Sequence, residues 1–458
     1  MKKSLLVIGA LAVLALAAVL AVPFWLGTKI EEVFHDRLAK LASNNGLIVA
    51  SEQFERGWLF SKARAMVRAP GLPVEFSAEH VIAHGPFRLD RWLAGDFALE
   101  PLRAHIETRG TLKVSMQVPI SLPISIDTTI AFNGEGHAHV ESPPHARAKD
   151  DDVEWAGLKG DVHFDAALQR IRADLHVPRL AYGPAEVVDM KLASNVREEI
   201  AGHYVGKMSF HIGSLSFGPM LRAKKLGIVT ETQVQESNLT VALSYDVLDV
   251  QTPNGQFGPG KLRIDARKLD AAILTKFQQE MNALQKSGRP QEQIGLMRVG
   301  KLMQLVGELA KKSPELEITE LRFRMGDEEI SGRAKLVLDG SKSDLTQNPL
   351  LILTAVAGDA ELLLPPALLK PMLLPLLMAD LEDYRRRGLL GAQPMTPEQT
   401  AAILDQSLPL YLARHDFTRR LIQDSGRYRL SASLRRGQIL VNGEPLSLPG
   451  AGVLPQRR

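Results

Sequence analysis

The period-two alternation of apolar and polar residues constrains the fold more than any other feature of the sequence. Between Leu239 and Val247 every second residue is apolar, and the residues between them are Thr, Ala, Ser and Asp. Strict alternation gives a strand one buried face and one solvated face, which is typical of antiparallel sheets. The same alternation recurs in the segments 112–118, 124–132, 162–168 and 171–177. The sequence therefore predicts a large antiparallel β-rich body.

Turn residues and changes of phase indicate how these strands connect and bend. Asn254-Gly255, Gly326-Asp327 and Arg436-Gly437 have the composition of tight hairpin turns. The alternation changes phase across Gly213 and again across Thr319-Glu320. A change of phase inside a strand is typical of a β-bulge, which bends the strand and lets a long sheet coil. We therefore expect a coiled sheet with bulges at these two places.

Two segments replace the alternation with helical spacing. Residues 269–312 contain two apolar stripes, which predict a helical hairpin. Residues 362–425 are expected to form a second helical block, which begins with a leucine- and proline-rich stretch at 362–378. Four prolines and Lys370 in that stretch argue against a membrane span, because a charge at mid-membrane costs about 2.5–3.5 kcal/mol. A helix buried on the body, or lying in a surface groove, is the better interpretation.

The N-terminal run Leu5–Leu26 contains 22 consecutive residues without a charge. As a helix it would be about 33 Å long, enough to cross a hydrocarbon core of about 30 Å. A cleaved signal peptide, with Ala15 and Ala17 at the cleavage site, is the alternative, but its apolar region is usually about 7–15 residues long. Lys2 and Lys3 before the run favour a cytoplasmic N-terminus. We expect an uncleaved single-pass anchor in the lipid bilayer, with the remaining chain outside the cytoplasm.

These observations predict an α+β chain in which an N-terminal transmembrane helix is followed by a large, coiled antiparallel β-sheet body with two helical inserts. The stretch after the anchor has one apolar stripe and is expected to be a helix that docks on the body. The predicted segments are a cytoplasmic tip and anchor (1–27), a juxtamembrane helix (28–46), a β-rich body (47–268), a helical hairpin (269–312), a β segment (313–361), a helical block (362–425) and a C-terminal β-hairpin with its tail (426–458).

The composition excludes several classes of protein. Hydrophobic residues make up 45% of the chain and charged residues 23%, which is too apolar for a disordered protein. The 55 basic and 52 acidic residues leave a net charge of +3, so no nucleic-acid partner is expected. The absence of cysteine excludes disulfides, thiolate metal ligands and cysteine nucleophiles.

Catalytic motifs are missing, and one histidine cluster is the candidate site. The sequence has no GxxxxGK[ST], HExxH or GxSxG motif, so we expect neither enzymatic activity nor a cofactor. His137, His139 and His145 are candidate metal ligands. Two histidines at i and i+2 of a strand share a face, and imidazole binds zinc or copper. The alternative is a solvated strand edge that runs into the loop at Pro143-Pro144.

Several segments, taken in order, resemble one protein family. They are ERGWLFSKA (Glu55–Ala63), VIAHGPF (Val81–Phe87), GKLRIDARKLDAAIL (Gly260–Leu274), SPELEITELRFRMGDEEISGRAKLVL (Ser313–Leu338) and GQILVNGEPL (Gly437–Leu446). The ordered set is similar to the YdgA-type family of bacterial envelope proteins, a domain of unknown function. This resemblance implies a Gram-negative inner-membrane anchor with the body in the periplasm. It implies no reaction, because the family has no established catalytic residues.

Two of these motifs are interpreted as structural. In the sequence His84-Gly85-Pro86-Phe87 the chain is expected to turn at Gly85-Pro86, with the His84 side chain making local hydrogen bonds. Trp58 is expected to pack its indole into the core at a bend of a strand. Neither motif therefore predicts a reaction.

The sequence favours a membrane-anchored periplasmic envelope protein without catalysis, which binds a lipid or a hydrophobic segment of a partner protein. The helical stripes look too few to cover the apolar faces of so many long strands. A looser architectural likeness to AsmA-like envelope proteins, which are associated with lipid handling, points the same way. Two alternatives stay open: an envelope metal-dependent hydrolase using His137, His139 and His145, and a structural scaffold that forms a homodimer through sheet edges or the helical block.

Overall fold

The computed structural model describes most of the body of the chain. The described residues are 31–32, 34–35, 48–69, 74–85, 95, 102–114, 120–145, 153–200, 202–253, 255–285, 287, 291–340, 352–389, 391, 396, 399–400, 402–403, 412–413, 418–424, 426–435 and 437–446. The predicted anchor at 5–26 lies outside them, as does most of the predicted helix at 28–46. Among the described residues, no helix combines the length and the apolar character needed to cross a bilayer.

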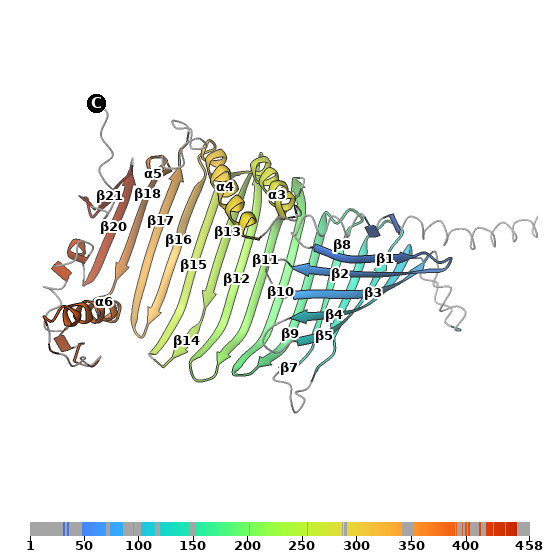
Figure 1. The fold of residues 1–458 in the computed structure, drawn as a ribbon, viewed down its shortest axis with the longest axis horizontal. Coiled ribbons are helices and arrows are strands. Elements are labelled where there is room, and N and C mark those ends of the chain that lie inside the picture. The colour runs from blue at the N-terminus through green and yellow to red at the C-terminus, as the bar shows by residue number, and fades with distance from the viewer. Residues whose placement is uncertain are drawn as a thin grey trace, which may run out of the picture. The chain divides into compact units, whose positions relative to one another are not determined.

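The described residues form 22 β-strands, and the pairings between them are antiparallel (Figure 1). The prediction of an antiparallel β-rich body is therefore confirmed. The sequence run with the clearest alternation, Leu239–Val247, lies in strand β13 (Asn238–Val247). The chain divides into two compact units: a first unit of Met1–Gly218 with Thr275–Arg298, and a second unit of Pro219–Leu274 with Val299–Arg458.

In the first unit most strands pair with their neighbours along the chain. The strands are β1 (Ile48–Glu55), β2 (Phe60–Ala69), β3 (Val74–His84), β4 (Ala104–Val114), β5 (Ile120–Ile130), β6 (Gly136–Ser142), β7 (Val153–Trp155), β8 (Leu158–Phe164), β9 (Arg170–Tyr182), β10 (Ala185–Ile200) and β11 (His203–Phe217). The pairs run β1–β2–β3–β4–β5–β6–β8–β9–β10–β11, and the short β7 also pairs with β9. Phe34, one of the helical residues described in the segment 28–46, packs against Phe54 and the cluster around Ile82.

The second unit repeats this hairpin arrangement. Its strands are β12 (Leu221–Gln235), β13, β14 (Asp249–Thr252), β15 (Gly255–Asp270), β16 (Glu315–Met325), β17 (Glu328–Leu338), β18 (Val356–Leu364), β19 (Ile422–Asp424), β20 (Arg427–Arg435), β21 (Gln438–Val441) and β22 (Glu444–Pro445). The pairs run β12–β13–β15–β16–β17–β18–β20–β21–β22; β14 pairs with both β12 and β15, and β19 pairs with β20.

The helices whose bounds are given by the described residues are α3 (Ala271–Gln285), α4 (Gln291–Ala310), the single-turn α5 (Ile352–Ala355), α6 (Pro366–Arg386) and the 3-10 turn η2 (Thr418–Arg420). The carboxylate of Asp270 begins α3 by accepting a hydrogen bond from the backbone N–H of Ile273 at 3.1 Å. Helix α6 contains the part of the leucine- and proline-rich stretch from Pro366 onward, whereas the first three residues of that stretch, 362–364, end strand β18; proline at the first turn of α6 suits a helix start. Its buried Leu369, Leu373 and Leu377 are four residues apart and pack in one core cluster, which confirms a buried helix there.

One predicted bulge is confirmed, and the other is absent from the pairing of β11 with β10. The pairing of β16 with β17 shifts register between Ile318 and Leu321, which places a bulge at Thr319-Glu320. Between β10 and β11 the register is the same on both sides of Gly213, so no extra residue is inserted there against β10. The irregularity lies on β10 itself, where Asp189 has a φ of 55°.

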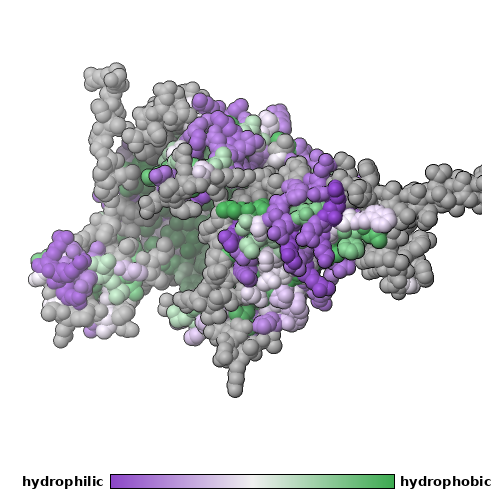
Figure 2. All heavy atoms as spheres, turned by 45° about the vertical axis from the view of Figure 1, so that its right-hand side comes forward, coloured by the Kyte–Doolittle hydropathy of each residue, from purple (hydrophilic) through white to green (hydrophobic). Residues whose placement is uncertain are grey.

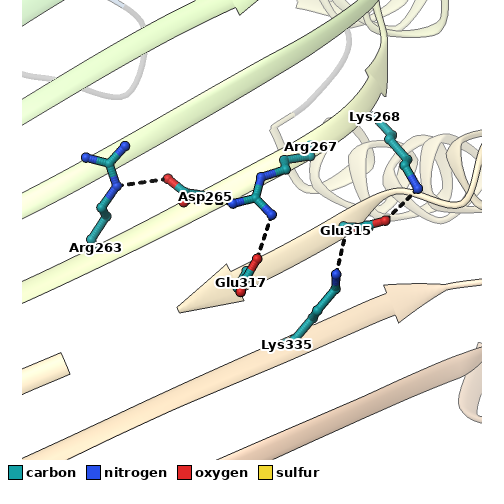
Figure 3. A network of polar contacts seen from close by, with 7 residues as sticks. All are labelled: Arg263, Asp265, Arg267, Lys268, Glu315, Glu317 and Lys335. Carbon is teal, nitrogen blue, oxygen red and sulfur yellow. Dashed lines mark hydrogen bonds and ion pairs between the residues drawn. The ribbon is translucent and has the colours of Figure 1, made fainter. Parts of the chain in front are cut away.

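One face of the second unit carries a ladder of ion pairs across three strands (Figure 3). Asp265 on β15 accepts hydrogen bonds from Arg263 and Arg267 at 3.2 and 3.1 Å. On β16, Glu315 binds Lys268 of β15 at 2.5 Å and Lys335 of β17 at 2.9 Å. Cross-strand pairs of opposite charge stabilise a sheet by about 0.2–1 kcal/mol each. The polar residues of the alternating pattern therefore stabilise the sheet through ion pairs on its solvated face.

Candidate functional site

The structure brings two of the three candidate histidines to one carboxylate. His137 and His139 lie on the same face of β6, because they are two residues apart on the strand. Their ring nitrogens Nε2 and Nδ1 contact the same Oδ1 of Asp161 on β8, at 2.9 and 3.0 Å. These hydrogen bonds, from His139 first and then His137, hold the pKa of Asp161 below its ordinary value. The His137 ring also stacks on His163, with centroids 4.4 Å apart.

The third candidate, His145, is placed differently. It follows β6 and forms an isolated antiparallel bridge with Trp155, whose backbone N–H and C=O it pairs at 3.1 and 2.7 Å. Among the described residues, the group whose donor atoms are close enough to share one metal ion is a different one, on β4 and β5. The metal-dependent hydrolase based on His137, His139 and His145 stays a prediction.

That group consists of His105, Glu107 and Asp127. One donor atom of each lies within 4.8 Å of the others. His105 Nε2 is 2.9 Å from Asp127 Oδ1, and His105 Nδ1 is 4.0 Å from Glu107 Oε1. The histidine side chain is only 6% exposed, whereas the two carboxylates are about half-exposed at 55% and 48%. Sequence analysis missed this group, because its members come together only through the pairing of two strands.

The register of the strands explains why these groups gather on one face. Directly paired residues of neighbouring strands lie on the same face of a sheet. The pairings of β4, β5, β6, β8, β9, β10 and β11 place six of the twelve histidines of the chain on one side. We call this the histidine face; its histidines are His105, His137, His139, His163, His176 and His211. A further pair on it joins His176 Nε2 to Asp189 at 2.9 Å.

Among the described residues, a large part of the apolar side of the second unit is partly exposed. Ile228, Tyr245, Leu262 and Leu321 follow one another across β12, β13, β15 and β16 in direct register. The same side carries Leu243, Ile264 and Ile318 in the next row, and Leu316 paired with Leu336 beyond it. We call these nine side chains the open apolar face. Each of them is at least partly exposed, and Figure 2 shows that hydrophobic residues reach the surface of the molecule.

Four side chains of this face show how far it is from a filled core. Leu316 is 46% exposed, Leu336 41%, and Ile228 and Tyr245 are each 38% exposed. In a packed sandwich the inward side chains interdigitate with a second layer and are almost fully buried. A contiguous apolar surface of this kind marks a binding surface for an apolar ligand or partner.

Comparison with known proteins identifies the family of the chain but no activity. No curated protein and no solved structure matches the chain significantly. The model of one family, described as a bacterial protein of unknown function (DUF945), matches residues 1–449 of the 458. Because the match covers nearly the whole sequence, from the apolar N-terminal run to the last β-hairpin, the chain belongs to the DUF945 family of bacterial proteins.

Proposed function

We propose that this chain is a non-enzymatic envelope protein that holds the acyl chains of lipids on the open apolar face of its second unit. The supporting observation is the half-exposure of apolar side chains that are in register across neighbouring strands, with Leu316 and Leu336 at 46% and 41%. Each methylene group that leaves water contributes about 0.8 kcal/mol. An acyl chain lying on this face is therefore stabilised along its length.

The dimensions of the face suit an elongated ligand. Its nine side chains lie on five paired strands, β12, β13, β15, β16 and β17. With neighbouring strands about 4.8 Å apart, these strands span about 19 Å. A flexible acyl chain can follow the twist of such a sheet, because it needs no hydrogen bonds and no fixed shape.

The proposal also includes the localisation of the protein in the cell. The 22 uncharged residues at Leu5–Leu26 support a single-pass anchor in the bacterial inner membrane. The likeness to YdgA-type proteins supports a body in the periplasm. A reporter enzyme that is active only in the periplasm, fused after Arg458, is expected to be active. Activity of a cytoplasmic reporter at the same position would contradict this orientation.

Site-specific photo-crosslinking in cells tests the lipid proposal. A photoreactive amino acid replaces Leu336 on the open apolar face or, as the matched control, Arg333 on the same strand. Residues three apart on a strand point to opposite faces, and Arg333 is 76% exposed on the polar side. We expect a lipid adduct, identified by mass spectrometry, at Leu336 and not at Arg333. Equal labelling at both positions, or none at Leu336 in folded protein, would refute the proposal.

A second candidate function, the dimerising scaffold, is favoured by helix α4. Leu296, Val299 and Leu302 recur every three residues on this helix and are 78%, 57% and 50% exposed. Such a stripe suits contact with the same helix of a second copy. In this case Leu296→Glu should shift the full chain in detergent from dimer to monomer, while the control Gln293→Glu leaves it a dimer. A monomeric wild-type chain would rule this function out.

A further inference from the structure

We propose that His105, Glu107 and Asp127 form a binding site for one divalent transition-metal ion, with zinc as the best-suited metal. The site lies on the histidine face of the first unit. It is independent of the lipid proposal, which concerns the apolar side of the second unit.

The pairing of β4 with β5 builds this site. His105 and Glu107 are two residues apart on β4 and therefore share a face. Asp127 on β5 is the direct cross-strand partner of Glu107. Regular backbone pairing thus sets the three side chains together, and two of them come from one strand. A site fixed in this way requires no loop to be ordered on binding.

The distances are close to those of a ligated ion. Donor atoms bound to zinc at about 2.0–2.2 Å in a tetrahedral arrangement lie about 3.4 Å apart. In the structure one donor atom of each of the three residues lies within 4.8 Å of the others, and His105 Nε2 is 2.9 Å from Asp127 Oδ1. Because one ion binds one ring nitrogen, and the contacts to Asp127 and Glu107 are made by Nε2 and Nδ1, the two half-exposed carboxylates must rotate to bind the same ion.

The chemistry of the donors selects the metal. One imidazole nitrogen and two carboxylate oxygens match the nitrogen and oxygen ligands that zinc accepts with three protein ligands and an open position. Calcium and magnesium prefer sets made of oxygen alone. Two carboxylates also supply the two negative charges that a divalent cation requires for neutralisation. A transition metal is therefore favoured over a hard cation.

Burial gives the site one rigid ligand and an entry route. The side chain of His105 is 6% exposed, so packing holds its ring in place. Glu107 and Asp127 are about half-exposed, at 48% and 55%, and leave the ion a path from solvent. His139 on β6 is the direct cross-strand partner of Asp127, but its ring nitrogen Nδ1 contacts Asp161 on β8 at 3.0 Å and is not counted among the ligands. Preorganised ligands next to solvent are expected to bind an ion reversibly.

Zinc titration of the purified full chain, after treatment with a chelator, tests this inference. Isothermal calorimetry gives the stoichiometry and affinity, and cobalt, which replaces zinc in such sites, gives a visible absorption band that reports ligation. The test variants are Asp127→Asn and Glu107→Gln, which keep the size of two half-exposed side chains. Asp161→Asn is the matched control: it makes the same change on the same face and contacts His137 and His139 instead.

We expect one zinc ion per chain, an affinity that falls about 100-fold or more in both test variants, and an affinity close to wild type in Asp161→Asn. The thermal midpoints of the metal-free variants show whether each remains folded. The inference is overturned if folded wild-type protein takes up no stoichiometric zinc, or if Asp127→Asn and Glu107→Gln bind zinc like wild type. It is also overturned if Asp161→Asn alone abolishes binding, which would place the metal at His137 and His139.

Discussion

Replacing Glu315 with glutamine tests whether the ion-pair ladder of the second unit stabilises the sheet. Glu315 on β16 lies between Lys268 on β15 and Lys335 on β17, with Nζ–Oε distances of 2.5 and 2.9 Å (Figure 3). Its side chain is only 14% exposed. The two lysine hydrogen bonds, that from Lys268 first, lower its pKa from 4.5 to about 2. Glutamine keeps the shape and removes the charge.

The free energy that the charge of Glu315 contributes to stability follows from this difference in pKa. A fall from 4.5 to about 2 corresponds to at most about 3–4 kcal/mol, since each pKa unit is about 1.4 kcal/mol. The two lysines are 55% and 46% exposed, and solvent screening reduces the effect to about 1–2 kcal/mol. Because the folded pKa is the lower one, the stabilisation is complete above about pH 4.5 and is lost as the pH falls toward 2.

Hydrogen exchange of peptides from β15, β16 and β17 measures this effect, because it reports local opening in a large chain of two units. The full chain and Glu315→Gln are compared at pH 7 and pH 3, with correction for the intrinsic exchange rate. Glu361→Gln is the control, since its partner Arg333 is 76% exposed and such a surface pair contributes about 0–1 kcal/mol. The reasoning fails if both variants lose the same protection, or if the Glu315→Gln difference is as large at pH 3 as at pH 7.

Three further substitutions test packing. Gly85→Ala should destabilise the first unit by more than about 3 kcal/mol, because a Cβ would lie 1.8 Å from the backbone oxygen of Leu102; a normal thermal midpoint would contradict this. Ser61→Ala should cost about 1–3 kcal/mol, because it removes the 2.9 Å partner of buried His84 Nε2, and exchange of β2 and β3 peptides measures it. Leu373→Ala should cost about 2–5 kcal/mol, because this side chain is 4% exposed in the α6 core; unchanged exchange of α6 peptides would refute it.

The alternation of apolar and polar residues and the turn residues in the sequence predicted the strands and many of their connections. The turn at Gly326-Asp327 is confirmed, because Met325 and Glu328 pair directly. The predicted turns at Asn254-Gly255 and Arg436-Gly437 each contain one residue outside the described ones; around them Thr252 pairs with Gly255, and Arg435 pairs with Gln438. The prediction for Trp58 was wrong: it lies in the bend between β1 and β2 and is 51% exposed. An aromatic residue beside a glycine carries no local signal that separates a packed bend from a solvated one.

The candidate site shows the limit of that local information. The spacing of His137 and His139 predicts a shared face, and the structure confirms that both reach one carboxylate. The partner Asp161 lies on another strand, and so does Asp127, the partner of His105. Which strands pair, and in what register, depends on interactions between segments far apart in the sequence. Sequence reasoning could therefore name single ligands but not complete groups.

The two faces of the second unit are linked by the way the sheet is stabilised. A sheet normally gains most of its stability by burying its apolar side, yet Leu316 and Leu336 remain 46% and 41% exposed. Ion pairs between neighbouring strands, such as those of Glu315, act on the opposite side and need no covering layer. Stabilisation from the polar face allows the apolar face to stay open. A scaffold of this kind can release a hydrophobic ligand without losing the interactions that hold its strands together.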